Sequence, residues 1–216
     1  QIFAKNDSPD VPFDRSINPY KGCEHGCVYC FARPTHSYLG LSPGLDFETK
    51  IVSKPQAAAR LEEALRKPSY RCDVLALGAN TDPYQPVGRD LGITRSLLEV
   101  LEAFHHPVCI VTKSNLVLRD LDLLALMAAR RQASVLVSIT TLDRELAPPD
   151  VVDERADGAR GREIGREHVG GDAVLVAEIG GQRIQTVLPA RDQPDVTAIA
   201  RDPTCEGFAD AARRPG

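Results

Sequence analysis

The sequence predicts an α/β fold built on a parallel sheet, because short apolar runs alternate with stretches of helical spacing along its first two-thirds. The apolar runs contain no polar alternation, which is typical of parallel strands covered on both faces. They lie at residues 74–77, 108–111 and 135–139. The helical stretches place their leucines and alanines on one side of a helix. They lie at 56–66, 94–104 and 120–130. This order of helix and strand suits either a barrel or a doubly wound sheet.

An earlier strand is expected at residues 16–20, where its carboxyl end would lead into a loop rich in glycine and cysteine. Pro19 has no N–H to donate to a sheet, so it restricts this strand to an edge or to a short length. We therefore expect a first, short strand that places the cysteine loop at the carboxyl edge of the sheet.

The alternation of helix and strand stops at residue 148. Residues 141–146 resemble the start of a further helix, which Pro148 and Pro149 would end. We therefore expect two parts, a core at 1–147 and a divergent tail at 148–216.

Within the tail, residues 153–171 are rich in glycine and charge and predict a loop or disorder. Residues 173–188 contain two apolar runs around Gly180 and Gly181, which is the pattern of a β-hairpin. The last stretch, 198–216, is expected to lack regular structure.

Composition favours a soluble, cytoplasmic protein. The chain has 216 residues, of which 43% are hydrophobic and 26% charged, enough for one large domain or one domain with an appendage. It has no apolar run near the roughly 20 residues needed to span a bilayer, and its first ten residues contain no signal-peptide core. The net charge of −4 argues against a broad nucleic-acid-binding surface but leaves room for a local groove.

Three of the six cysteines lie together in residues 23–30, which read CEHGCVYC. This clustering indicates a metal site in a reducing compartment rather than a disulfide framework. Three thiolates in a C-x3-C-x2-C spacing, Cys23, Cys27 and Cys30, can hold three irons of a [4Fe–4S] cluster and leave the fourth iron open. Gly22 and Gly26 would let the backbone bend around the cluster.

A structural zinc site is the alternative interpretation of this loop. Zinc requires a fourth ligand from elsewhere, and His25, His36 and Cys72 are the candidates. Because a second C-x2-C pair is missing, the spacing favours the iron–sulfur cluster.

With these motifs the chain resembles the radical S-adenosylmethionine superfamily, in particular its spore photoproduct lyase-related branch. The similarity is carried by INPYKGCEHGCVYCFARPTH at 17–36, with Tyr29 in the aromatic position of the cysteine motif, and by ANTDPYQP at 79–86. It covers about residues 11–147. The resemblance implies a partial (β/α)6 TIM-like barrel, with the cluster loop after the first strand, that this chain would leave incomplete after residue 147.

The resemblance also implies a radical enzyme. The open iron would bind the amino and carboxylate groups of S-adenosyl-L-methionine, and one electron would cleave its sulfonium bond to give a 5′-deoxyadenosyl radical that abstracts a substrate hydrogen. Tyr29 would pack by the adenine, and a flavodoxin or ferredoxin would supply the electron. The substrate is not specified. A lyase acting on DNA photoproducts is one alternative, to which the acidic balance gives little support.

Further cofactor-binding candidates follow the predicted strands. Asn80, Thr81 and Asp82 come after the run at 74–77, where they could bind the ammonium group of the cofactor or simply form a capped turn. Lys113 and Ser114 follow the next run, and Lys113 could meet a carboxylate there or remain a solvated loop charge.

Ser138 and Thr140 end the last run and could contact ribose or carboxylate oxygens, or satisfy backbone groups. Arg33 and His36, after the cysteine loop, could tune the cluster, touch substrate or pair locally. The adjacent His105 and His106 are expected on the surface.

Two interpretations without enzymatic activity stay open. One is a zinc-binding module. The other is an inactive fragment in which a shifted reading frame replaces the remaining units of the barrel after Pro148.

Overall fold

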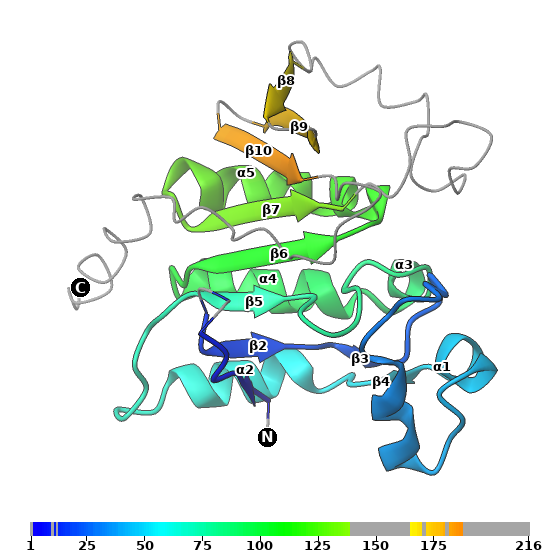
Figure 1. The fold of residues 1–216 in the computed structure, drawn as a ribbon. Coiled ribbons are helices and arrows are strands. Elements are labelled where there is room, and N and C mark those ends of the chain that lie inside the picture. The colour runs from blue at the N-terminus through cyan, green and yellow to red at the C-terminus, as the bar shows by residue number, and fades with distance from the viewer. Residues whose placement is uncertain are drawn as a thin grey trace.

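The central element is a five-stranded, mostly parallel sheet (Figure 1). The computed structural model describes residues 2–9, 11 and 13–138, together with the backbone of three later strands. The sheet has the order β1-β2-β5-β6-β7, in which β2, β5, β6 and β7 are parallel and β1 is an antiparallel edge strand. The strands are β1 (Ala4–Lys5), β2 (Arg15–Ile17), β5 (Leu75–Leu77), β6 (Val108–Thr112) and β7 (Ala133–Val137). The predicted mixed α/β architecture with a parallel sheet is therefore confirmed.

Three helices connect the parallel strands and lie along one face of the sheet (Figure 1). They are α2 (Ala57–Leu65), α4 (Ile93–Ala103) and α5 (Leu121–Ala129), which confirms the three helices predicted from spacing. Shorter helical segments fill the loops. They are η1 (Arg33–Leu39), α1 (Leu45–Thr49), α3 (Gly88–Leu91) and η2 (Asn115–Asp120).

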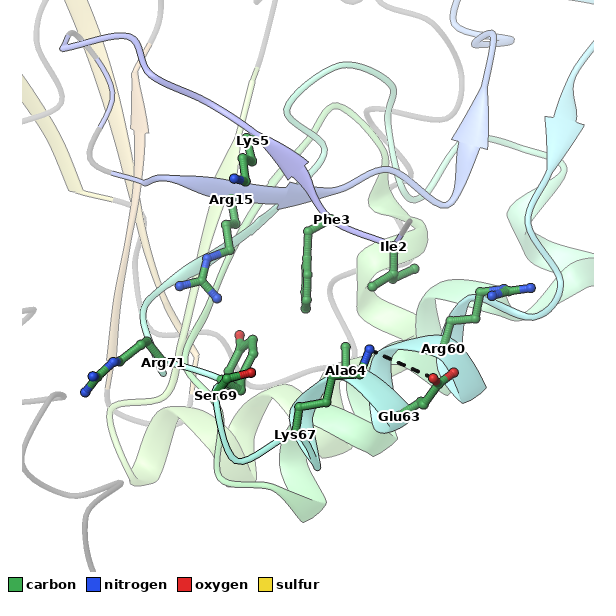
Figure 2. Close-up of a pocket in the computed structure, with 11 residues that line it drawn as sticks. Ile2, Phe3, Lys5, Arg15, Arg60, Glu63, Ala64, Lys67, Ser69 and Arg71 are labelled. Carbon is green, nitrogen blue, oxygen red and sulfur yellow. Dashed lines mark ion pairs between the residues drawn. The ribbon is translucent and has the colours of Figure 1, made fainter.

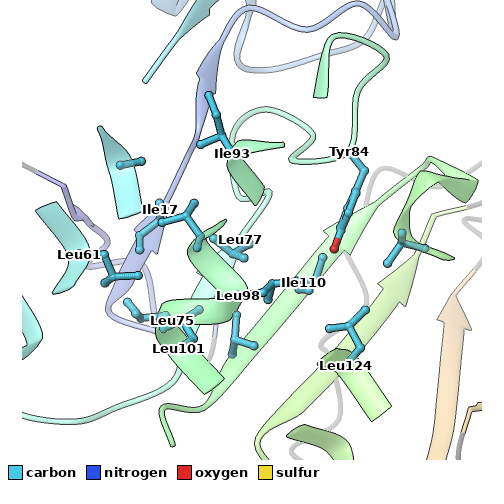
Figure 3. Close-up of a cluster of buried hydrophobic side chains, with 14 of the residues drawn as sticks. Ile17, Leu61, Leu75, Leu77, Tyr84, Ile93, Leu98, Leu101, Ile110 and Leu124 are labelled. Atoms are coloured by element: carbon cyan, nitrogen blue, oxygen red, sulfur yellow. The ribbon is translucent and has the colours of Figure 1, made fainter. Parts of the chain in front are cut away.

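The hydrophobic core lies between this helical layer and the sheet (Figure 3). Strand residues Leu75 and Leu77 are fully buried against Leu98 and Leu101 of α4. Each such leucine contributes about 1.5–3 kcal/mol by leaving water. The parallel strands and their helices therefore form a well-packed unit that can hold loops at the sheet edge in fixed positions.

The other face of the sheet is less covered than the apolar runs predicted. All three residues of β5 are buried, whereas β6 alternates, with Val108 and Ile110 buried and Cys109 and Val111 only half-buried. The expectation of cover on both faces is therefore correct for β5 and wrong for β6 and for β7, where no residue is fully buried. Cys109 lies on the half-buried face rather than in the core.

The first predicted strand is divided in two. β2 ends at Ile17, and the chain resumes as β3 (Tyr20–Lys21), which pairs antiparallel with β4 (Val52–Ser53) in a separate small sheet. Pro19 lies at the break and, lacking an N–H, cannot continue the ladder. This break turns the chain toward the cysteine loop.

In the tail, the structure describes β8 (Gly165–Val169), β9 (Asp172–Ile179) and β10 (Gln182–Val187) as one antiparallel sheet. β9 and β10 pair as the predicted hairpin, with Ile179 opposite Gln182. β8 falls in the segment predicted as loop or disorder. It forms a strand by pairing with β9, a contact that its composition did not indicate. The predicted helix at 141–146 and the end at 198–216 lie outside the described residues.

None of the described helices is long and apolar enough to span a membrane.

The adjacent histidines differ in environment, so the surface prediction is correct for His105 and wrong for His106. His105 is exposed, whereas His106 is 2% exposed. Its Nδ1 lies 2.9 Å from the Pro107 carbonyl oxygen and its Nε2 lies 2.8 Å from the Tyr70 hydroxyl. Burial lowers the pKa of His106 to about 4, so the neutral ring donates to Pro107 and accepts from Tyr70.

We expect the stability of the protein to fall by up to about 3 kcal/mol as the pH drops from 7 to 4. The unfolded histidine takes up a proton near pH 6.5, whereas His106 stays neutral until about pH 4, so acid favours the unfolded chain across this window. Urea unfolding of wild type and His106→Gln at several pH values measures this slope. The slope should shrink in His106→Gln and persist in His105→Gln, and equal slopes in wild type and His106→Gln would refute the assignment.

Candidate functional site

The three clustered cysteines follow β3 directly and lie at the carboxyl edge of the parallel sheet. The loops after β5, β6 and β7 begin at the same edge, because all of these strands run in one direction. Residues 78–87, 113–114 and 138 therefore share this edge with the cysteine loop. Loops at this edge form the binding and catalytic sites of many α/β proteins.

Tight turns give the cysteine loop its shape. Gly22 and Gly26 have φ of +84° and +62°, which other residues rarely adopt. A Cβ on Gly22 would lie 2.8 Å from the Phe47 carbonyl oxygen. Backbone N–H groups of Gly26 and Cys30 close turns on the carbonyls of Cys23 and Cys27 at 3.3 and 3.1 Å. The glycines predicted to bend this loop are thus placed at its bends.

The three thiols differ in burial. Cys23 is 8% exposed, and burial raises its pKa to about 11, whereas Cys27 and Cys30 are partly exposed. All three are free thiols. Among the described residues, no three His, Cys, Asp or Glu side chains are already arranged around a point as ligands of one metal ion. Metal binding here would need the protons of these thiols to leave, most of all that of Cys23.

Arg33 anchors the cysteine loop by hydrogen bonds to its backbone carbonyls. Its guanidinium donates to the carbonyls of Gly26 and Cys27 at 2.8 and 2.9 Å, to the turn at 43–44, and to the carboxylate of Glu48. These bonds satisfy the donors of Arg33 within the protein. The structure therefore gives Arg33 the local pairing role among the predicted alternatives.

His36 has a similar local role. It is fully buried, its Nε2 lies 3.0 Å from the Lys50 carbonyl oxygen, and its ring meets Phe47 edge-on at 5.3 Å. Cys72 precedes β5 and so lies at the amino end of the sheet, away from the cysteine loop. Of the three candidates for a fourth zinc ligand, His36 is therefore engaged locally and Cys72 lies away from the loop.

Asp82 joins the cysteine loop to two strand-end loops. Its carboxylate accepts from the Thr112 hydroxyl and the Lys113 N–H, both at 2.7 Å, and from the Tyr84 N–H at 2.8 Å. The His25 Nε2 lies 3.3 Å from its Oδ2, at ion-pair distance. Burial alone would raise the pKa of Asp82, but His25 and these donors outweigh it and lower that pKa. With 8% of its side chain exposed and these contacts made, Asp82 positions the loops.

Replacing Asp82 with asparagine should destabilise the fold by about 2–3 kcal/mol, because an amide cannot accept at both positions and leaves a buried donor unpaired. The free energy of unfolding from urea titration measures this loss. Asp90→Asn, on the exposed side of α3, is the matched control and should change it by less than about 0.5 kcal/mol. Equal effects at the two positions would show that Asp82 does not organise the loops.

Gln85 also anchors the cysteine loop, a role that the sequence did not predict. Its fully buried amide accepts from the Glu24 N–H at 3.0 Å and donates to the Gly22 carbonyl at 3.2 Å. Glu24 in turn accepts from the Val87 N–H at 2.5 Å. The only sequence feature that could have indicated this role is the place of Gln85 beside Pro86 in the motif at 79–86.

The cofactor-binding residues predicted after β5 differ in whether their side chains are already hydrogen-bonded within the protein. The buried Thr81 hydroxyl donates to the Tyr20 carbonyl at 2.9 Å, which is a structural use. The exposed Asn80 is anchored by its backbone N–H, 3.0 Å from Asn18 Oδ1, and no hydrogen bond joins its side-chain amide to another described residue. Of this predicted trio, Asn80 has the side chain most accessible to a ligand.

The residues predicted after β6 and β7 meet the cysteine loop. The Lys113 Nζ donates to the Ser138 hydroxyl at 2.8 Å and lies 5.8 Å from the centre of the Tyr29 ring. Ser114 instead accepts from the Leu116 N–H at 3.1 Å and begins η2. The structure thus brings Tyr29, Lys113 and Ser138 together but uses Ser114 locally. Thr140 lies outside the described residues.

Comparison with known proteins finds relatives that are described as uncharacterized proteins. The chain is 46% identical over 136 residues to an uncharacterized protein of Mycobacterium tuberculosis and to one of Mycobacterium bovis, covering 63% of this chain and 40% of each relative. An uncharacterized protein of Methanocaldococcus jannaschii is 29% identical over 107 residues, or 50% of this chain and 38% of that protein. No family model and no solved structure matches the chain. The chain therefore spans about 40% of the length of the curated relatives it matches.

Proposed function

We propose that this chain is the core of a radical S-adenosylmethionine enzyme, with Cys23, Cys27 and Cys30 as ligands of a [4Fe–4S] cluster. One observation carries the proposal: three free thiols in a C-x3-C-x2-C loop lie at the carboxyl edge of a parallel sheet, beside the loops that follow the neighbouring strands. The finer description of the fold, a partial (β/α)6 barrel, belongs to the same proposal. In support, parallel strands carry their helices on one face and leave the other less covered.

The donor set suits an iron–sulfur cluster. Three soft thiolates from one loop provide one ligand for each of three irons and leave one iron open to a small chelating molecule. When bound, the cluster would supply the electron that cleaves the sulfonium bond of S-adenosylmethionine. A zinc site draws four ligands around one ion, whereas the Nε2 of His36 lies 3.0 Å from the Lys50 carbonyl oxygen and Cys72 lies at the other end of the sheet.

The surrounding contacts would hold the thiols in register. Arg33, Asp82 and Gln85 fix the loop through bonds to backbone and side chains on both sides of it. A loop held in this way loses little further conformational entropy when it binds a cluster, which favours binding.

The exposed groups beside the loop would bind the cofactor. Tyr29, 67% exposed, has a free ring surface for an adenine, and Lys113 beside it provides a positive charge for a carboxylate. Ser138 holds the Lys113 ammonium in place, and Asn80 offers an amide oxygen to the cofactor ammonium. Val28 and Phe31, 88% and 75% exposed, would help to exclude water from this site once a ligand covers them.

Anaerobic reconstitution with iron and sulfide tests the metal assignment. We expect a brown protein with about four irons and four sulfides per chain. The matched measurement loads the same protein with zinc. A colourless protein that retains zinc and takes up no iron would overturn the proposal.

A further inference from the structure

A cavity lies at the amino end of the parallel strands, away from the cysteine loop (Figure 2). Its volume is about 520 Å³, within the usual range for small-ligand sites. The walls come from the N-terminal segment with β1, the start of β2, the second half of α2 and residues 69–71. Because β2 begins at this cavity and its other end leads toward the cysteines, this site is separate from the proposed cluster site.

The cavity is strongly positive although the chain as a whole is acidic. Its walls carry one carboxylate, Glu63, and five cationic side chains. The cations are Lys5, Arg15, Arg60, Lys67 and Arg71. Lys67 lies 3.9 Å from Glu63, and within the described residues the other four cations make no ion pair. A formal excess of four positive charges gathered around one cavity, in a chain of net charge −4, favours an anionic ligand.

Two of these cations are held side by side. Lys5 of β1 pairs directly with Arg15 of β2 in the antiparallel register. Like charges directly opposite each other destabilise a strand pair. An anion bound between Lys5 and Arg15 would relieve this repulsion, so the pair is better suited to a liganded than to an empty cavity.

Aromatic contacts fix the Arg15 guanidinium in the cavity wall. It lies 5.0 Å from the centre of the Tyr70 ring and 6.0 Å from that of Phe3. Tyr70 is itself held by the buried His106, 2.8 Å from its hydroxyl. Figure 2 shows Phe3 projecting into the cavity between the cations. A fixed guanidinium beside an aromatic ring suits a ligand that has both phosphate and a planar base.

We propose that this cavity binds a phosphate-bearing small molecule of nucleotide size. Its phosphates would contact Arg15 and Lys5, and its base would pack against Phe3. A single cavity of this volume, rather than an extended basic stripe, favours a small ligand over a nucleic-acid strand. The proposal does not depend on the iron–sulfur assignment.

Isothermal titration of the full chain with ATP, adenosine and inorganic tripolyphosphate tests this site. We expect ATP to bind wild type, Arg15→Gln to weaken it at least about tenfold, and Phe3→Leu to weaken ATP more than tripolyphosphate. Arg66→Gln is the matched control: it removes one cation directly after α2, outside this cavity, and should leave ATP affinity within about twofold.

Cys27→Ala should also retain ATP binding, which separates this site from the cluster site. Should Arg15→Gln fail to fold, the exposed pair Arg60→Gln and Arg71→Gln provides the same test with the same expected loss. The proposal is overturned if wild type does not bind ATP, if Arg66→Gln weakens binding as much as the cavity variants, or if a single-stranded oligonucleotide binds while ATP does not.

Discussion

Replacing Cys27 with alanine is expected to lower the iron content of the reconstituted protein from about four atoms per chain to background. A cubane held by three thiolates keeps only two protein ligands when one is removed, and two ligands hold it poorly. Cys27 is partly exposed, so its loss should leave the folded state intact. Iron and sulfide analysis, with thermal melting as the check on folding, measures both effects.

Cys72→Ala is the matched control for this variant. Cys72 is also partly exposed, but it lies before β5 at the other end of the sheet, so its removal should leave the iron content unchanged. The comparison also tests the zinc interpretation in which Cys72 is the fourth ligand. A zinc site that used Cys72 as its fourth ligand would lose metal in both variants, and equal losses would contradict the cluster assignment.

The second large effect is expected at Gly78, where alanine should destabilise the fold by more than about 4 kcal/mol. Gly78 has φ +91°, and an added Cβ would lie 2.1 Å from the Val111 carbonyl oxygen. Strand β6 would have to move away from β5 to accommodate it. The loop that carries Asp82 and Gln85 begins here, so we expect this variant to lose the site together with the sheet edge.

Gly40→Ala separates backbone strain from the clash. Gly40 also has a positive φ, +71°, but an added Cβ would meet no atom within 4 Å. Its expected cost is therefore the conformational strain alone, about 1–2 kcal/mol. Urea unfolding of the two variants gives the comparison. A similar loss in both would mean that the close approach to Val111 does not constrain the sheet.

The regular elements were predictable because their residues carry a periodic signal. Leu97, Leu98 and Leu101 define one face of α4, and the run at 74–77 marks β5. The pairing of β3 with β4 and helix α1 were missed because each element is short and depends on distant contacts, such as the buried Phe47. Such elements are stabilised by tertiary packing, which local sequence does not record.

The candidate site was predictable where its chemistry depends on residue spacing. It was not predictable where it depends on contacts between residues that are distant in the sequence. The cysteine motif located the loop, and parallel strands located its neighbours. Sequence could not show that Thr81 and Ser114 would satisfy backbone groups, or that Asp82 would be enclosed by donors. His106 was placed wrongly because its burial depends on Tyr70, 36 positions away in the chain.

The most direct test of the proposed function is production of 5′-deoxyadenosine by the anaerobically reconstituted protein after addition of S-adenosylmethionine and dithionite. Wild type should release it, and Cys27→Ala, equally folded, should not. A protein that holds about four irons per chain but releases no deoxyadenosine would contradict radical S-adenosylmethionine chemistry in this chain.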